Sequence, residues 1–176
     1  MNTEKIDFIL KRRSIRKYTT QPVNDEIIEL LLKAAMSAPS AVGKDPWRFI
    51  IVKDKKLKQR IVEQLPNGKM MSEAPVGIVV LGDINAAHSN LPGYLLQDCS
   101  AAIENLLLAA SSLGLGAVWL GVYPREERMN HIKTVFNLPE NIIPVACIAV
   151  GYPAEKKEAR TRYNPNFVHF EKWESK

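Results

Sequence analysis

The chain has 176 residues, 46% of them hydrophobic, with 24 Lys plus Arg against 19 Asp plus Glu, a formal net charge of +5. This size suits one domain around a single sizeable core, and so mild a charge suits a phosphate-bearing ligand as well as a nucleic acid. Only two cysteines occur, both inside apolar runs, which argues against a disulfide framework and a thiolate zinc site and favours a reducing, cytoplasmic compartment.

Two helices are predicted near the N-terminus. Thr3 can cap the first, whose apolar residues recur at helical spacing before a basic stretch. Asn24 and the two acidic residues after it start the second, which ends at the breaker Ala38-Pro39-Ser40. The basic stretch therefore lies just after a helix.

Strands and a loop follow. Aromatic and β-branched residues over 47–52 predict a strand, and the charged segment 55–64 predicts a helix. The apolar run 76–81, bounded by proline and glycine, is typical of a central strand covered on both faces. Segment 83–96 has little periodicity and is predicted to be a loop or a broken turn of helix. Loops of this length often line ligand sites, so residues 85–96 and segment 67–73 are candidates to face a substrate.

The second half is more strongly apolar. Residues 97–113 are apolar nearly all the way round, so we expect a helix buried on most sides, with a partner subunit as its natural cover. It is too short to span a bilayer, which takes about 20 apolar residues, and no membrane span is predicted. Gly114 stops this helix and 115–122 reads as a buried strand. A helix over 124–136 and a strand over 145–150 complete the pattern.

The last segment, 152–176, is polar and charged and has too few apolar residues for a core of its own. Its spaced aromatics Phe167, Phe170 and Trp173 favour packing on another surface. Because strands and helices alternate irregularly along the chain, we expect a mixed sheet with helices on both faces, in the α+β or α/β class.

Three guanidinium groups and a hydroxyl fall within five positions, at Arg12, Arg13, Ser14 and Arg16. Guanidinium groups bind phosphate oxygens through paired hydrogen bonds, and serine adds a neutral donor, so the cluster is a candidate phosphate site. A solvated basic turn is the alternative, since runs of charge are usually surface features. A nucleic-acid patch is a weaker rival, because no nucleic-acid-binding motif accompanies the cluster.

Other motifs point away from side-chain catalysis. Gly114-Leu115-Gly116 follows a helix and precedes a strand, the reverse of the dinucleotide fingerprint, so a helix stop and a tight strand entry explain both glycines. Backbone amides near Leu120 and Gly121 could donate to a flat heterocycle that approaches where no Cβ intrudes. The three histidines stand far apart, which argues against a metal site. These features fit a protein whose organic cofactor performs the chemistry.

Taken together, these segments resemble the FMN-dependent nitroreductase family, and the resemblance covers nearly the whole chain. The motifs that carry it are Arg12-Arg13-Ser14-Ile15-Arg16 with Tyr18, Ala38-Pro39-Ser40-Ala41, Pro46-Trp47-Arg48-Phe49, Asp98, Gly114-Leu115-Gly116 with Trp119 and Gly121, and Gly151-Tyr152-Pro153. The resemblance implies an α+β, three-layer α/β/α fold around a mixed, mainly antiparallel sheet, in a homodimer. Residues 1–176 would form one domain, with 152–176 a C-terminal tail packed on the partner subunit.

The resemblance also implies a cofactor site. Arg12, Arg13 and Ser14 would hold the phosphate and ribityl chain of FMN. Arg16 would lie near the N1 and O2 edge of the isoalloxazine ring, where it would support the reduced flavin.

Further contacts would come from the two subunits. Pro39, Ser40 and Ala41 would reach the same flavin from the second subunit. Leu120 and Gly121 would offer backbone donors near N5 and O4.

The tail and one loop complete this implied site. Arg160 and Arg162, soon after the Gly-Tyr-Pro turn, match positions that contact the phosphate. The sequence departs from the family before Pro-Trp, where Gly43 and Asp45 stand in place of the common Asn and Gln. Gly43 lacks an amide that usually addresses the pyrimidine edge of the flavin, and Asp45 places an acceptor where a carboxamide is usual.

The activity implied is that of an FMN-dependent oxidoreductase that takes hydride from NADH or NADPH at flavin N5. It would reduce nitroaromatics, quinones or similar flat acceptors by a ping-pong mechanism. The implied partners are a second copy of the chain and a small-molecule electron acceptor, with no nucleic acid and no membrane. Two alternatives stay open: another flavin chemistry on the same fold, such as a dehydrogenase, dehalogenase or flavin-consuming enzyme, and a non-catalytic flavin-binding protein.

Overall fold

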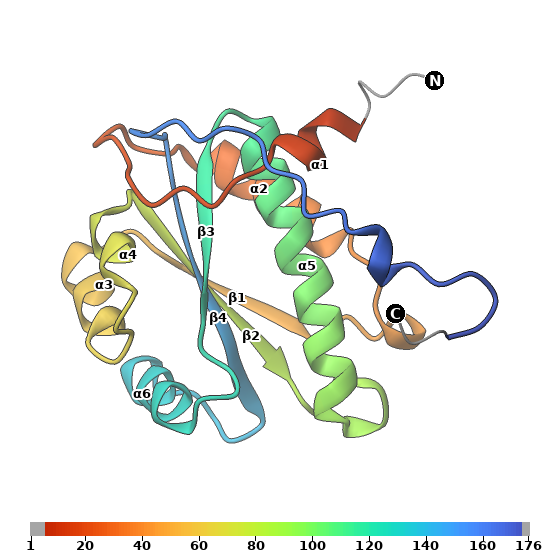
Figure 1. Ribbon diagram of the computed structural model, residues 1–176. Coiled ribbons are helices and arrows are strands. Elements are labelled where there is room, and N and C mark those ends of the chain that lie inside the picture. The colour runs from red at the N-terminus through yellow and green to blue at the C-terminus, as the bar shows by residue number, and fades with distance from the viewer. Residues whose placement is uncertain (1–5, 174–176) are drawn as a thin grey trace.

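The computed structural model describes residues 6–173, which fold into helices on both sides of one sheet (Figure 1). The helices are α1 (Asp7–Lys11), α2 (Asp25–Met36), α3 (Lys55–Val62), α4 (Lys69–Glu73), α5 (Pro92–Ser112) and α6 (Glu126–Phe136), and the strands are β1 (Trp47–Val52), β2 (Val76–Asp83), β3 (Gly116–Gly121) and β4 (Ile142–Gly151). Short 3-10 turns lie at η2 (Ala41–Gly43), η3 (His88–Asn90) and η4 (Pro165–Phe167).

The strands pair in the order β1-β2-β4-β3, and every pair is antiparallel. β2 lies between β1 and β4 and is buried from Val76 to Gly82, which confirms the prediction of a central strand covered on both faces. Within the described residues, the parallel component of the sheet is one bridge between Ser14 and Ala117 on the outer edge of β3. The α+β class is therefore confirmed.

Helices cover both faces of the sheet, so the predicted three-layer architecture is confirmed (Figure 1). α2 and α5 pack together on one face, where Leu31, Ile103 and Leu106 are fully buried. α3, α4 and α6 cover the other face, with Ile61 and Ile132 fully buried. Each face thus has its own apolar cluster, and the two meet through the strands.

Local chemistry sets several boundaries where the sequence placed them. The Asn24 side chain accepts a hydrogen bond from the Ile27 amide (3.0 Å), which confirms the predicted cap of α2. Asp54 caps α3 in the same way, through the Leu57 amide at 2.7 Å, although α3 ends two positions before the predicted residue 64. The proposed cap at Thr3 lies outside the described residues.

The prediction of a loop or a broken turn of helix over 83–96 is wrong at its end, where a regular helix has already begun. α5 begins at Pro92 and is 21 residues long, five residues earlier than the predicted start at 97. Proline suits the first position of a helix, because it has no amide hydrogen to leave unpaired. Leu95 in the first turn of α5 is fully buried, and this packing is not visible in the weak periodicity of the sequence. Segment 67–73 likewise contains the short helix α4, because Met71 is fully buried.

The C-terminal segment runs back beside the N-terminal one after β4, through a bridge between Tyr18 and Pro153 (Figure 1). Its aromatic side chains are largely exposed in the single chain, at 79% for Phe167, 85% for Phe170 and 80% for Trp173. None of the helices in residues 6–173 is long and apolar enough to cross a membrane.

Candidate functional site

The basic segment after α1 is fixed along the edge of β3. The Ile15 amide donates to the Ala117 carbonyl oxygen at 3.0 Å, and the Tyr18 hydroxyl donates to the Ile15 carbonyl oxygen at 2.6 Å. A Cβ on Gly116 would lie 2.6 Å from Ile15 Cγ2, so only glycine permits this close approach. Burial raises the pKa of Tyr18 above its ordinary range, so its hydroxyl keeps its proton and its hydrogen bond.

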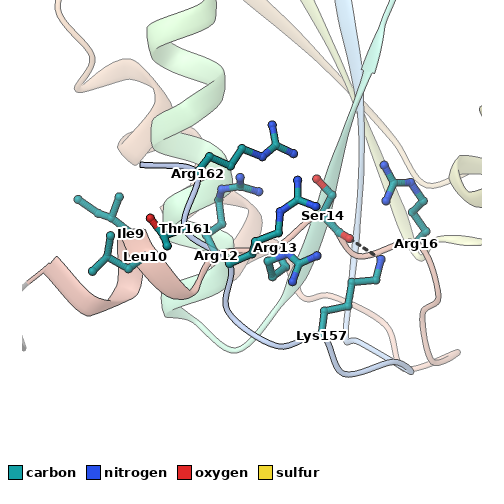
Figure 2. Close-up of a pocket in the computed structure, with 10 residues that line it drawn as sticks. Ile9, Leu10, Arg12, Arg13, Ser14, Arg16, Lys157, Thr161 and Arg162 are labelled. Carbon is teal, nitrogen blue, oxygen red and sulfur yellow. Dashed lines mark hydrogen bonds between the residues drawn. The ribbon is translucent and has the colours of Figure 1, made fainter. Parts of the chain in front are cut away.

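The tail lies directly against this segment (Figure 2). The Ala154 amide donates to the Lys17 carbonyl oxygen at 2.9 Å, and Lys157 Nζ donates to the Ser14 carbonyl oxygen at 2.8 Å. The Arg13 guanidinium donates to the Glu158 carbonyl oxygen. Two segments about 140 positions apart in the sequence thus meet as one surface.

Between them lies an open pocket of about 650 Å³ (Figure 2). Its lining residues are Ile9, Leu10, Arg12, Arg13, Ser14, Arg16, Lys157, Arg160, Thr161 and Arg162. The structure therefore brings together six of the residues singled out from the sequence, four from the first segment and two from the tail. Sequence reasoning missed Lys157, which stands in an ordinary charged run and gives no local signal.

The charges around this pocket are only partly balanced. Arg12 Nε lies 3.4 Å from Glu104 of α5, and Lys157 lies 3.1 Å from Glu155. Among residues 6–173 the guanidinium groups of Arg13, Arg16, Arg160 and Arg162 form no ion pair. The pocket therefore carries an excess of positive charge that suits an anionic group.

Glu155 acts on the backbone of the basic segment. Its Oε1 accepts hydrogen bonds from the amides of Arg16 (2.5 Å) and Lys17 (3.3 Å). The bond from Arg16, followed by contacts with Lys157 and Lys17, lowers the pKa of Glu155. Its carboxylate is therefore charged at neutral pH and holds the chain while leaving the Arg16 guanidinium unpaired.

A second, smaller pocket of about 180 Å³ adjoins the first, because Arg16 lines both. Its lining residues are Arg16, Leu65, Asn67, Gly68, Trp119, Leu120, Gly121 and Arg128. Nothing lies within 4 Å of the position that a Cβ on Gly121 would take, so the edge of β3 is open there. Arg128 Nη1 donates to the Gly121 carbonyl oxygen at 2.9 Å.

This second pocket contains both backbone positions singled out from the sequence, Leu120 and Gly121. It also contains Asn67 and Gly68, the first two residues of segment 67–73, which the sequence offered as a candidate to face a substrate. Sequence reasoning missed Arg128. This residue lies in the helix predicted over 124–136, and its contact with β3 depends on tertiary packing, so it carries no sequence signal of a site.

Pro39, Ser40 and Ala41 line neither pocket of their own chain. They lie in the connection between α2 and β1, where the Ala41 amide contacts Asp98 of α5. Their predicted contact with a flavin of the second subunit stays a prediction, as do the roles of Gly43 and Asp45.

The arrangement favours binding over side-chain chemistry. The described residues contain no group of three or more His, Cys, Asp or Glu side chains placed to hold a metal ion. Burial raises the pKa of both thiols, Cys99 and Cys147, to about 12, so neither supplies a thiolate at neutral pH. The site offers a cationic pocket and, sharing Arg16 with it, a second pocket at an open strand edge, an arrangement that suits a flat molecule with a phosphate at one end.

Comparison with known proteins agrees with this architecture. A model described as "Nitroreductase family" matches residues 9–68 and 62–152. A protein of Methanothermobacter thermautotrophicus, provisionally named NADH dehydrogenase/NAD(P)H nitroreductase, is 47% identical over 96% of this chain and 87% of its own length. A crystal structure of a similarly named protein of Bacteroides thetaiotaomicron has a TM-score of 0.92 and 39% identity, covering 98% of this chain and all of that one (100%). A provisionally named nitroreductase of Desulfovibrio desulfuricans, solved in complex with FMN, has a TM-score of 0.83 and 32% identity over 96% of this chain and 97% of that chain.

Proposed function

The chain belongs to the nitroreductase family, and from that premise we propose that it is an NAD(P)H-dependent oxidoreductase that carries FMN across the two adjoining pockets. The observation that carries the proposal is that these two pockets share Arg16 in their linings, with an excess of guanidinium groups in the first and the open edge of β3 in the second. FMN has the same polarity, with a phosphate dianion at one end and a flat ring at the other.

The residues fit the cofactor by chemistry as well as by charge. Arg13, Arg160 and Arg162 have no ion pair among the described residues, so they are available to a phosphate that Arg12 and Ser14 also face. At the other end, the missing Cβ of Gly121 would let a flat ring approach the backbone closely. Leu120 and Gly121 would then present backbone groups to the ring.

Bound FMN would supply a hydride acceptor, and the protein would supply binding and electrostatics. Arg16 would place a positive charge beside the ring, which favours the added negative charge of the reduced state. Glu155 would support this role by fixing the Arg16 backbone through its amide. NADH or NADPH would deliver hydride, and a flat acceptor such as a nitroaromatic or quinone would bind to the same face afterwards, in a ping-pong cycle.

The proposal includes a homodimer in which residues 1–176 form one domain. Pro39, Ser40 and Ala41 would contact the flavin of the second copy. The exposed aromatics of the tail, together with exposed apolar residues of α1, would pack on that copy. The support is that these side chains have no cover in the single chain.

The visible spectrum of the purified protein tests the proposal. We expect a yellow protein with bound FMN that bleaches when NADPH or NADH is added without oxygen. We expect Arg13→Met to weaken FMN binding and Lys33→Met, which removes an exposed cation on α2, to leave it unchanged. A protein that binds no FMN would refute the proposal, and one that binds FMN but is not reduced would be the non-catalytic alternative.

A further inference from the structure

The loop between α2 and β1 adopts an unusual backbone conformation. Val42, Gly43 and Asp45 all have positive φ, at 55°, 62° and 48°. This region is unfavourable for a β-branched residue such as Val42, whose side chain is 74% exposed and gains no packing in return. Such conformations persist only where the surroundings impose them, and they cluster at functional sites.

One restraint comes from Asp98 on α5. Its Oδ1 accepts a hydrogen bond from the Ala41 amide at 2.9 Å. The residue is only 5% exposed, and its Oδ2 has no hydrogen-bond partner within residues 6–173. A buried carboxylate with one unpaired oxygen costs stability, so stability alone does not explain its presence.

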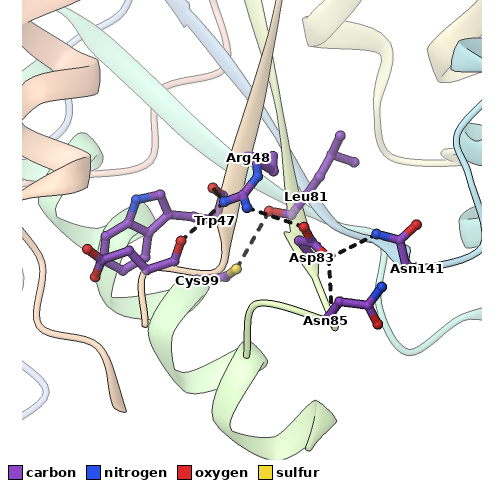
Figure 3. A network of polar contacts seen from close by, with 8 residues as sticks. Trp47, Arg48, Leu81, Asp83, Asn85, Cys99 and Asn141 are labelled. Atoms are coloured by element: carbon purple, nitrogen blue, oxygen red, sulfur yellow. Dashed lines mark hydrogen bonds and ion pairs between the residues drawn. The ribbon is translucent and has the colours of Figure 1, made fainter. Parts of the chain in front are cut away.

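A second restraint comes from Arg48 at the start of β1 (Figure 3). Its Nη1 donates to the carbonyl oxygens of Trp47 (2.8 Å) and Asp45 (3.2 Å), and its Nη2 lies 3.2 Å from Asp83 Oδ2. Asp83 also accepts from Asn141 at 2.9 Å, the main cause of its lowered pKa, and so stays charged. Arg48 thereby ties the end of the loop to the end of β2.

The loop also closes on itself. The Ser40 hydroxyl donates to Asp45 Oδ1 at 2.5 Å, and the Asp45 amide donates to Ser40 Oγ at 3.1 Å. Asp45 is therefore engaged within the loop. The result is a segment restrained at its start by Asp98, at its end by Arg48 and across its base by Ser40, with Val42 exposed at its tip.

We propose that Asp98 and Arg48 are positioning residues that preset this loop for contact with the flavin of a second copy. The inference rests on the proposed function, in which Pro39, Ser40 and Ala41 reach that flavin across a dimer. A loop ordered before binding loses less entropy when it meets its ligand, so its restraints act on FMN affinity. The restrained loop lines neither the phosphate pocket nor the second pocket of its own chain.

Asp98→Ala, Asp98→Asn and Arg48→Met test this directly. Asp98→Asn keeps a side-chain oxygen that can accept from the Ala41 amide, whereas Asp98→Ala removes it. We expect Asp98→Ala and Arg48→Met to weaken FMN binding about tenfold or more, and Asp98→Asn to stay within about threefold of wild type. Sedimentation and thermal unfolding check that each variant remains a folded dimer. Wild-type affinity in a folded Asp98→Ala dimer would overturn the proposal.

Mixed dimers supply a readout that a merely structural role would not move. One copy carries Asp98→Ala and the other carries Arg13→Ala. If the loop serves the second copy, one of the two sites combines an intact phosphate pocket with an intact loop, so each mixed dimer binds one FMN with wild-type affinity. If the loop serves its own copy, both sites are damaged and no tight site remains, which would overturn the inference.

Wild-type protein separates this inference from the proposed function. If wild type binds no FMN, the proposed function itself fails. If wild type binds FMN and the mixed dimers recover no tight site, the contact of the loop with the second copy's flavin fails together with the positioning role, while FMN binding by the two pockets stands. Should Asp98→Ala not fold, Arg48→Met takes its place in the mixed dimer, since the Arg48 side chain is 46% exposed and its loss leaves no cavity in the core.

Discussion

Replacing Gly116 by alanine tests how the basic segment is held. The new Cβ would lie 2.6 Å from Ile15 Cγ2 and 2.7 Å from Ile15 Cβ. Ordinary carbon contacts are about 3.5–4.0 Å, so β3 and the segment must separate by roughly 1 Å. Isoleucine is stiff at χ1, and the Ile15 amide is bonded to Ala117, so the side chain cannot rotate away and the backbone has to move.

The expected cost is that of overpacking, about 1–3 kcal/mol in the free energy of unfolding. For a chain of this size each kcal/mol shifts Tm by about 2–4 °C, so Gly116→Ala should lower Tm by roughly 2–12 °C. The same movement displaces Arg13, Ser14 and Arg16 relative to the tail, so FMN binding should weaken as well.

Gly121→Ala is the matched control in the same strand, because nothing lies within 4 Å of its added Cβ. We expect it to leave Tm unchanged but to weaken FMN, since the methyl group would stand where the ring approaches. Thermal unfolding and titration of apo-protein with FMN measure both effects. Wild-type stability and affinity in Gly116→Ala would refute the argument that contact with Ile15 sets the cofactor pocket.

Three further substitutions address the site. Arg16→Ala should mainly lower the midpoint potential of the bound flavin, with a smaller effect on the binding of oxidised FMN. Ser14→Ala should mainly weaken FMN binding and leave the potential unchanged, because phosphate contacts act equally on both redox states. Equal effects of the two variants in a spectroelectrochemical titration would contradict this. Glu155→Gln should lower Tm at neutral pH. The pKa of Glu155 is lowered from its ordinary value of 4.5, so its charged carboxylate stabilises the folded state at pH values above 4.5. The Tm difference between wild type and variant should close as acid protonates the folded carboxylate, and a difference that persists in acid would argue against this role. Gly43→Asn should tighten FMN binding by up to roughly tenfold, because it restores a side-chain amide that can address the pyrimidine edge of the flavin. Asparagine tolerates the φ of +62° at this position, and an unchanged Kd would place residue 43 away from the flavin.

Elements with strong local signals were predicted well. The strand over 47–52 has the observed bounds of β1, and Asn24 caps α2, because aromatic and β-branched composition and helix capping are properties of a few neighbouring residues. Prediction was wrong where burial decides. Burial of Met71 and Leu95 against the sheet stabilises α4 and the first turn of α5 as helices. A single buried residue in a short segment produces no periodic pattern in the sequence.

The site divides in the same way. Arg12 to Arg16 form a cluster in the sequence, so their chemistry could be read directly. Lys157 and Arg128 reach the pockets from distant segments, and Asp98 was seen only as one residue of a family motif. Pairing between segments so far apart depends on strand order, which the local pattern does not specify.

The cationic pocket keeps its positive charge because the side chains that fix the basic segment and the tail bind backbone groups. Glu155 binds the Arg16 and Lys17 amides, and Arg13 donates to a carbonyl oxygen, so these contacts fix the backbone without neutralising the guanidinium groups. Had Glu155 paired with the Arg16 side chain, the same carboxylate would have cancelled the charge that a reduced flavin needs. Apart from its pair with Lys157, the Glu155 carboxylate thus binds backbone donors, and the guanidinium groups of Arg13 and Arg16 keep their charge for a ligand.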